Sequence, residues 1–189
     1  MNRLLDLMSI QAMDIIDFWF AGPMPAYWFR STPELDAEIR RLFEPTWEEA
    51  LAGGYRHWEE SAQGCLALAI ILDQFPLNMF RGQPRAFSSE AQAIGVTLHA
   101  ERKGFDRQLT GEQQAFLYMP LMHSENLQHQ DESVRLFEAA GLMSNARFAR
   151  HHRELIRRFG RFPHRNAILG RPSTDLELAY LSSKEAFTG

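Results

Sequence analysis

The sequence predicts an all-α fold. No window shows the alternation of polar and apolar residues that marks a strand, and valine occurs only at Val96 and Val134. Apolar residues instead recur at helical spacing between short connectors that contain glycine and proline. We therefore expect an array of eight or nine helices, and the short connectors predict that neighbouring helices run mostly antiparallel.

The composition is that of one soluble globular domain, residues 1–189, with 45% apolar and 23% charged residues. The longest apolar run, Cys65 to Leu72, is too short to cross a bilayer. Asp6 interrupts the apolar cluster between Met1 and Ile10, and no small-residue cleavage site follows, which argues against a signal peptide. A single cysteine excludes an internal disulfide. A cytoplasmic location fits these features, and no membrane contact is expected.

The first helices follow from apolar spacing and breakers. Ala12 to Phe20 forms one apolar face and is stopped by the Gly-Pro-Met-Pro run that begins at Gly22. Ser31-Thr-Pro-Glu34 predicts a helix start, with proline in the first turn. We expect that helix to end after Phe43, and a separate short helix through Trp47 to end at the glycine pair 53–54.

The middle of the chain begins with a buried helix. Ser61 is a candidate cap for it, and residues 65–72 are apolar on nearly every side, as in a helix surrounded by other helices. This helix is expected to end at Asp73-Gln74-Phe75-Pro76. Ser88 or Ser89 then begins a helix that reaches Lys103 and is closed by Gly104.

Capping boxes mark two of the remaining helices. Thr110-Gly-Glu-Gln113 predicts the start of a helix around Phe116, and Thr174-Asp-Leu-Glu177 predicts the start of the last one. Between them, Met122 to Ala140 is expected to form one long helix, and Asn145 to Phe159 another that ends at Gly160.

One connector occurs twice. Residues 74–84 and 161–172 share Phe-Pro followed by Asn-x-x-x-Gly-x-Pro, and the two Phe-Pro prolines lie 87 positions apart. Proline cannot continue a regular helix, so we expect Phe75 and Phe162 to leave their helices and anchor in the core. The shared residues predict architecture. The unshared residues, which include most of the charges, are the more informative ones for function.

Asp73 ends an apolar helix, where the helix dipole disfavours a carboxylate. It therefore needs a partner, and an arginine from either connector is the natural one. In a continuous helix after Pro120, His123 and Gln130 would lie on the same stripe as apolar residues. Buried polar groups need partners, so these two side chains either bond within the core or line a pocket. Glu125 falls roughly opposite that stripe.

The net charge of −4 hides a basic segment. Residues 142–172 contain eight arginines against Glu154 alone, which gives this segment a net charge of +7. The planar guanidinium of arginine binds carboxylates and phosphates, often with two hydrogen bonds. The commonest alternative is a solvated or ion-paired helix face.

Several motifs together resemble one known family. They are Asp-Phe-Trp-Phe (17–20), Ile-Leu-Asp-Gln-Phe-Pro (71–76), Asn-Met-Phe-Arg-Gly (78–82), Met-His-Ser-Glu (122–125) and Arg-Phe-Gly-Arg-Phe-Pro-His-Arg-Asn (158–166). From Ile15 to Leu181 the chain closely resembles the bacterial domain-of-unknown-function family 924. The resemblance implies a helical fold of the tetratricopeptide-like superfamily and carries no established activity.

Three functions from different classes fit the residues. The first is the binding of an anionic small molecule between the two connectors, where the expected contacts are Arg81, Arg85, Gln130, Arg161, Arg165, Asn166 and Arg171. The second is a hydrolase-type enzyme at the same place. There His123 or His164 would be the general acid or base, and Asp73 or Glu125 would orient it.

The third function is a helical scaffold that binds an acidic peptide or protein through the arginines between Arg147 and Arg158. Nucleic acid is not an expected partner, because the chain is acidic overall and its basic face lacks interleaved aromatic residues. His123-Ser-Glu125 has the H-x-E spelling of a zinc deaminase but lacks the cysteine pair, so we expect no metal. No cofactor is implied, and the sequence leaves the oligomeric state open.

Overall fold

The computed structural model describes residues 10–187, and every regular element in that range is helical. The all-α prediction is confirmed. The α-helices are α1 (Ala12–Phe20), α2 (Pro33–Leu51), α3 (Ala62–Ala69), α4 (Phe75–Met79), α5 (Glu90–Lys103), α6 (Gly111–His123), α7 (Leu127–Ala139), α8 (Met143–Phe159) and α9 (Asp175–Leu181). Residues 1–9, on which most of the argument about a signal peptide depends, lie outside the described part. In the described part no helix has the length and apolarity that a membrane span requires.

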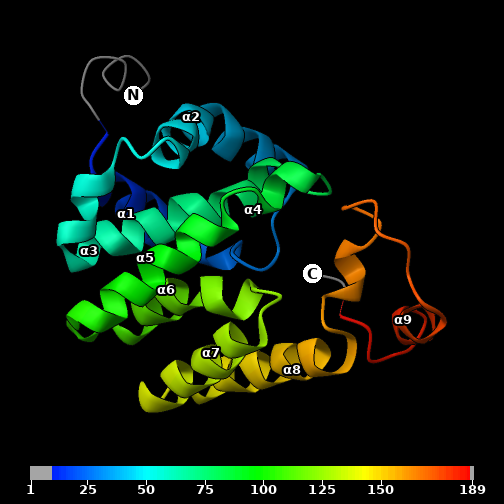
Figure 1. Cartoon of the computed structure of the whole chain (residues 1–189). Coiled ribbons are helices and arrows are strands. Elements are labelled where there is room, and N and C mark those ends of the chain that lie inside the picture. Colours follow the sequence, from blue (N-terminus) through cyan, green and yellow to red (C-terminus); the bar gives the residue numbers. More distant parts are fainter. Residues whose placement is uncertain (1–9, 188–189) are drawn as a thin grey trace.

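The helices are stacked in layers (Figure 1). α2 and α4 pack together at one end, α3, α5 and α6 form the middle, and α7 with α8 forms the other end. Of the middle helices, α3 is buried along nearly its whole length. The main core reaches from α1 to the first half of α8.

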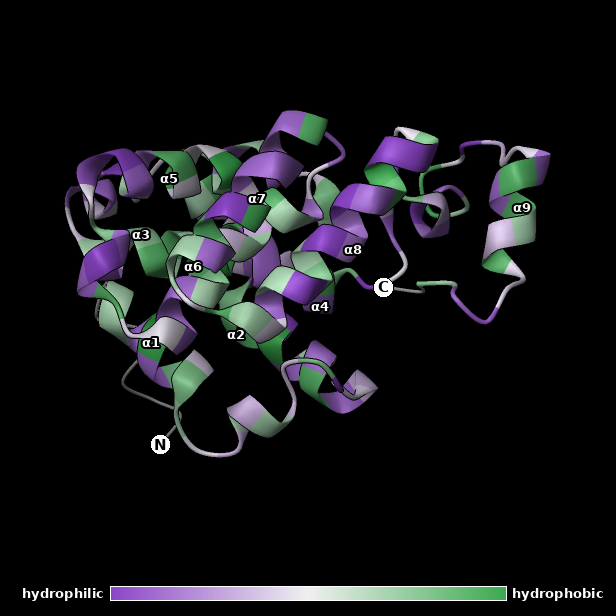
Figure 2. Cartoon of the chain, turned by 90° about the horizontal axis from the view of Figure 1, so that it is seen from below, coloured by the Kyte–Doolittle hydropathy of each residue, from purple (hydrophilic) through white to green (hydrophobic). Residues whose placement is uncertain are grey.

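A second, smaller cluster lies beyond the main core. Leu155 and Ile156 of α8 pack there with Phe162 and Tyr180. The chain after α8 leaves the stack through a connector that contains one 3₁₀ turn, η6 (Pro163–Arg165), and α9 stands apart from the other helices in both views (Figures 1 and 2). The second Phe-Pro connector thus joins the stack to this outer part.

Local end signals work well in this chain. The side chains of Ser61, Thr110 and Thr174 cap their helices, and the latter two form the predicted capping boxes. Gly104 and Gly160 adopt the left-handed conformation after α5 and α8, as expected of C-terminal glycines. All of these interactions span only a few residues, which is why sequence alone finds them.

Proline did not end α2. We expected a break after Phe43, but the helix runs through Pro45 to Leu51. The carbonyl that loses its N–H partner belongs to Arg41, four residues earlier and exposed, where water can satisfy it.

The predicted long helix from Met122 to Ala140 is in fact two helices. Ser124 is extended, and the side chain of Asn126 accepts hydrogen bonds from the amides of Gln128 and His129 to start α7. The predicted stripe of His123 and Gln130 on one continuous helix is therefore wrong. Gln130 is fully buried and donates to the carbonyls of Met122 and Ser124, 2.7 Å each, which stabilises the end of α6.

The two Phe-Pro connectors share a sequence but differ in conformation. Phe75 does not leave its helix: a π-helical segment, η3 (Ile70–Gln74), leads directly into α4, with Pro76 in its first turn. The Leu72 carbonyl, left without an N–H by Pro76, accepts a 2.6 Å hydrogen bond from Ser89 Oγ. Phe162, by contrast, is extended as predicted, and Pro163 begins a single 3₁₀ turn.

Candidate functional site

Asp73 and His123 form the centre of the candidate site. Asp73 lies in the π-helical segment, a kind of irregularity that is frequent at functional sites. His123 is the last residue of α6. Its Nδ1 lies 2.9 Å and 3.0 Å from the two carboxylate oxygens of Asp73. Because an ionised carboxylate only accepts, Nδ1 carries a proton and donates it.

Among residues 10–187, the groups around this pair leave Nε2 of His123 without a hydrogen bond. Asp73 is 5% exposed and also accepts from the side-chain amide of Gln74. The His123 side chain is 20% exposed, and no group in residues 10–187 hydrogen-bonds to its Nε2. The prediction that an arginine pairs with Asp73 is wrong, since histidine takes that place.

Arg165 ties three elements together beside this pair. It donates to Glu90 Oε2 of α5 at 2.9 Å and to the His123 carbonyl of α6 at 2.7 Å. Its guanidinium carbon lies 4.5 Å and 4.8 Å from the ring centroids of Phe87 and Phe162. Burial raises the pKa of Glu90 above its ordinary value, against the opposing effect of Arg165. The second connector is thereby fixed to the end of the helix that carries His123.

Glu125 belongs to a neighbouring network rather than to the histidine. Both of its oxygens accept from Arg171, at 2.6 and 2.8 Å, and one also accepts from the Phe162 amide. Burial works against this charge, but these bonds hold the pKa of Glu125 below its ordinary value. Asn166 accepts from Arg171 Nε and donates to Ser173 Oγ. These three predicted site residues fold the second connector onto α6 and α7.

His164 lies on the same connector, among aromatic rings. Its ring centroid is 5.5 Å from that of Phe162 and 5.1 Å from that of Phe187. Burial, with help from the neighbouring Arg165 charge, lowers the pKa of His164 to about 4. In the described part of the chain, residues 10–187, its Nδ1 is buried without a hydrogen-bond partner, and so is Nε of Arg165.

Three predicted contacts are engaged elsewhere. Arg81 pairs with Asp36, which also accepts from Asn78. Arg161 holds Glu177 of α9 through two bonds of 2.7 and 2.8 Å. The third residue is Arg85, which has partners on α2.

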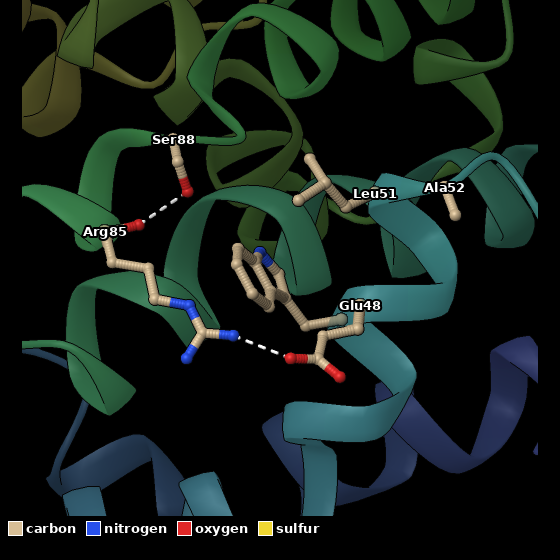
Figure 3. A pocket seen from close by; sticks show the side chains of 6 residues that line it. Glu48, Leu51, Ala52, Arg85 and Ser88 are labelled. Carbon is tan, nitrogen blue, oxygen red and sulfur yellow. Dashed lines mark hydrogen bonds and ion pairs between the residues drawn. The ribbon is translucent and has the colours of Figure 1, made fainter.

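Arg85 bonds to Glu44 and Glu48 and covers the rings of Trp47 and Phe80. It borders an open depression of about 520 Å³ whose other lining residues are Trp47, Glu48, Leu51, Ala52 and Ser88 (Figure 3). The bonds of Arg81 and Arg85 thus hold the first connector to α2, whereas those of Arg165 and Arg171 hold the second to α5 and the α6–α7 turn.

Sequence reasoning missed Glu90, Gln74 and Phe187. Glu90 was not singled out beside the predicted helix start at Ser88 or Ser89, because its partner Arg165 is 75 positions away. Gln74 was noted beside Asp73 without a role, and nothing local distinguishes Phe187 from other terminal residues. No group of three or more His, Cys, Asp or Glu side chains in residues 10–187 is arranged to hold a metal ion.

The fold and the site define a class: an all-helical protein in which a buried Asp–His pair lies beside an arginine-tied connector. The model of the family described as bacterial protein of unknown function (DUF924) matches residues 15–185, and the chain belongs to this family. It is also similar to the solved structure of a protein of unknown function from Agrobacterium tumefaciens. That similarity has a TM-score of 0.85 and 35% identity, over 90% of this chain and 96% of the other. No curated protein matches the chain.

Proposed function

We propose that the protein is a hydrolase-type enzyme in which His123 is the general base and Asp73 orients it. The observation that carries this proposal is the contact of His123 Nδ1 with both oxygens of Asp73, while Nε2 of the partly exposed ring has no hydrogen bond from the described residues. A neutral imidazole protonated at Nδ1 carries its lone pair on Nε2, and that atom can accept a proton from a reacting group.

The buried carboxylate favours this chemistry in two ways. It fixes the tautomer and the orientation of the ring, and it stabilises the imidazolium that forms when Nε2 takes a proton. In residues 10–187 no hydroxyl or thiol is hydrogen-bonded to the His123 ring. Ser124, its neighbour in sequence, is buried, and its Oγ accepts from the Asn126 amide and lies 2.9 Å from His129 Nδ1. Burial raises the pKa of the Cys65 thiol to about 12. We therefore take water as the attacking group.

The test is a turnover screen with paired variants. Purified protein is assayed against p-nitrophenyl esters of short carboxylic acids and of phosphate, and active pairs are repeated with His123→Gln. Loss of a general base lowers turnover about 10²–10⁴-fold. Arg81→Gln, which removes a charge on the α2 side of the molecule, is the control and keeps full activity. Hydrolysis that survives His123→Gln would sink the proposal.

A second candidate is binding of an anionic small molecule without turnover. Two buried nitrogens that have no hydrogen-bond partner in residues 10–187, Arg165 Nε and His164 Nδ1, favour it, and the first of them is a donor. Calorimetric titration with inorganic phosphate and with citrate separates the two functions. Binding that is lost in Arg165→Gln but retained in His123→Gln supports a binding protein, and no heat in any variant removes this candidate.

The scaffold function receives less support. Arg150 and Arg153 of the α8 face are already paired with Glu138 and Asp131 of α7. Such compensation leaves less free charge for an acidic peptide.

A further inference from the structure

The C-terminal segment lies over one histidine of the site. After α9 the chain turns back, and Phe187, the last described residue, packs its ring against His164 and His152 with centroid distances of 5.1 and 4.6 Å. The second imidazole belongs to α8, so the ring of Phe187 fills the space between that helix and the second connector. His151 contributes a further edge at 6.2 Å.

Few contacts hold this segment down. The Phe187 amide donates to Tyr180 Oη at 2.8 Å, and Tyr180 is itself buried against Phe159. The intervening residues 182–185 are exposed, and their backbone amides bond only locally, to Leu178, Tyr180 and Ser183. A segment with one half-buried ring and one hydrogen bond at its end opens at a much lower free energy than the helices it covers.

The covered histidine has an unmet hydrogen-bonding need. Among residues 10–187, His164 Nδ1 is buried without a hydrogen-bond partner. His164 lies on the connector that Arg165 ties to the His123 carbonyl. A buried polar atom without a partner calls for an explanation. One explanation is a ligand that bonds to His164 Nδ1 only when the Phe187 ring has moved away.

We propose that residues 182–187 form a strap, with Phe187 as its plug, that covers His164 and can leave it. The candidate site then has a covered state and an open state, and in the open state His164 is a second imidazole accessible to a ligand. Its contribution to turnover rests on the function proposed above, whereas the existence of the strap does not.

The reactivity of His164 toward diethyl pyrocarbonate tests the strap directly. The reagent acylates accessible unprotonated imidazole nitrogens, and trypsin releases His164 in the short peptide 162–165, so its rate is read by mass spectrometry. In Phe187→Ala we expect acylation of His164 to accelerate about tenfold, the factor that corresponds to losing the packing of one half-buried ring. His57, which is exposed far from the strap in the sequence, is the internal reference and keeps its rate.

Two further variants make the result decisive. Tyr180→Phe keeps the aromatic ring of residue 180 but removes the hydroxyl that accepts from the Phe187 amide. We expect it to accelerate the acylation of His164 less than Phe187→Ala does. Leu178→Ala truncates an exposed apolar residue on the same helix and leaves the rate unchanged. Equal His164 rates in the wild type, Phe187→Ala and Tyr180→Phe would overturn the strap. A faster His164 together with hydrolysis that survives His123→Gln would uphold the strap and refute the catalytic proposal alone.

Discussion

Asp73 holds Nδ1 of His123 with both carboxylate oxygens, across fifty positions of sequence. Two irregular features make this possible. The π-helical segment places Asp73 in a buried position after α3, a helix that is buried along nearly its whole length, and α6 ends at His123 instead of continuing into α7. The pair therefore depends on where two helices stop being regular.

The first prediction concerns the proton on His123. In histidine-labelled protein, ¹⁵N–¹H correlation spectra of the neutral ring will show Nδ1–H in the wild type, because the Asp73 carboxylate only accepts. Asp73→Ala removes this constraint and gives a mixture of both tautomers. Ser88→Ala is the control and leaves the His123 signals unchanged. A wild-type ring protonated at Nε2 would contradict the geometry.

The second prediction compares one arginine from each connector. Arg165→Gln breaks a pair in which the arginine side chain is 7% exposed and the Glu90 side chain 23% exposed, and it should cost about 3 kcal/mol of unfolding free energy, the lower end for a buried pair. Arg81→Gln removes a 58% exposed side chain from Asp36 and should cost about 1 kcal/mol or less. Urea unfolding measures both. Similar losses of unfolding free energy in the two variants would contradict the prediction that the more buried ion pair contributes more to stability.

The third prediction concerns the Ser89 hydroxyl, which donates to the Leu72 carbonyl next to Pro76. Ser89 is fully buried; its Oγ donates to the Leu72 carbonyl and accepts from Trp47 Nε1 at 3.0 Å. Ser89→Ala leaves both groups unsatisfied and should cost about 2–4 kcal/mol. Ser88→Ala, at the exposed neighbouring position, is the matched control and should change stability by about 0.5 kcal/mol or less. Urea midpoints that coincide for the two variants would reject this role.

The fourth prediction is a pH dependence that comes from Glu177. Its hydrogen bonds with Arg161 lower the pKa of Glu177 to about 2, against about 4.3 in an unfolded chain. A lowered carboxyl pKa stabilises the folded state above the unfolded value, and this contribution disappears as the pH falls toward the folded value. The stability difference between wild type and Glu177→Gln should therefore be constant above about pH 5 and shrink between about pH 4 and pH 2. Denaturant unfolding over that range measures it, and a difference that grows on acidification would contradict the assignment.

The site was partly predictable. Asp73 and His123 stood out because polar residues on apolar helices need partners, and the sequence nominated both. It nominated the wrong partner for Asp73, because arginine is the commoner choice and nothing local shows which helix end arrives beside the carboxylate. Arg81 and Arg165 occupy similar connectors in the sequence, yet the contacts of one lead to α2 and those of the other to α5 and α6.

The sequence by itself determined the helical class and most helix ends, because capping by Ser61, Thr110 and Thr174, and by the glycines after α5 and α8, is settled within a few residues. Only the tertiary structure decided what the repeated Phe-Pro does. At Pro76 the helix continues because Ser89, from the next helix start, satisfies the carbonyl that proline leaves free. The Asp73–His123 pair was also beyond local rules, because its two residues lie fifty positions apart. A hydrogen bond between such remote residues forms only when the helices that carry them have packed together.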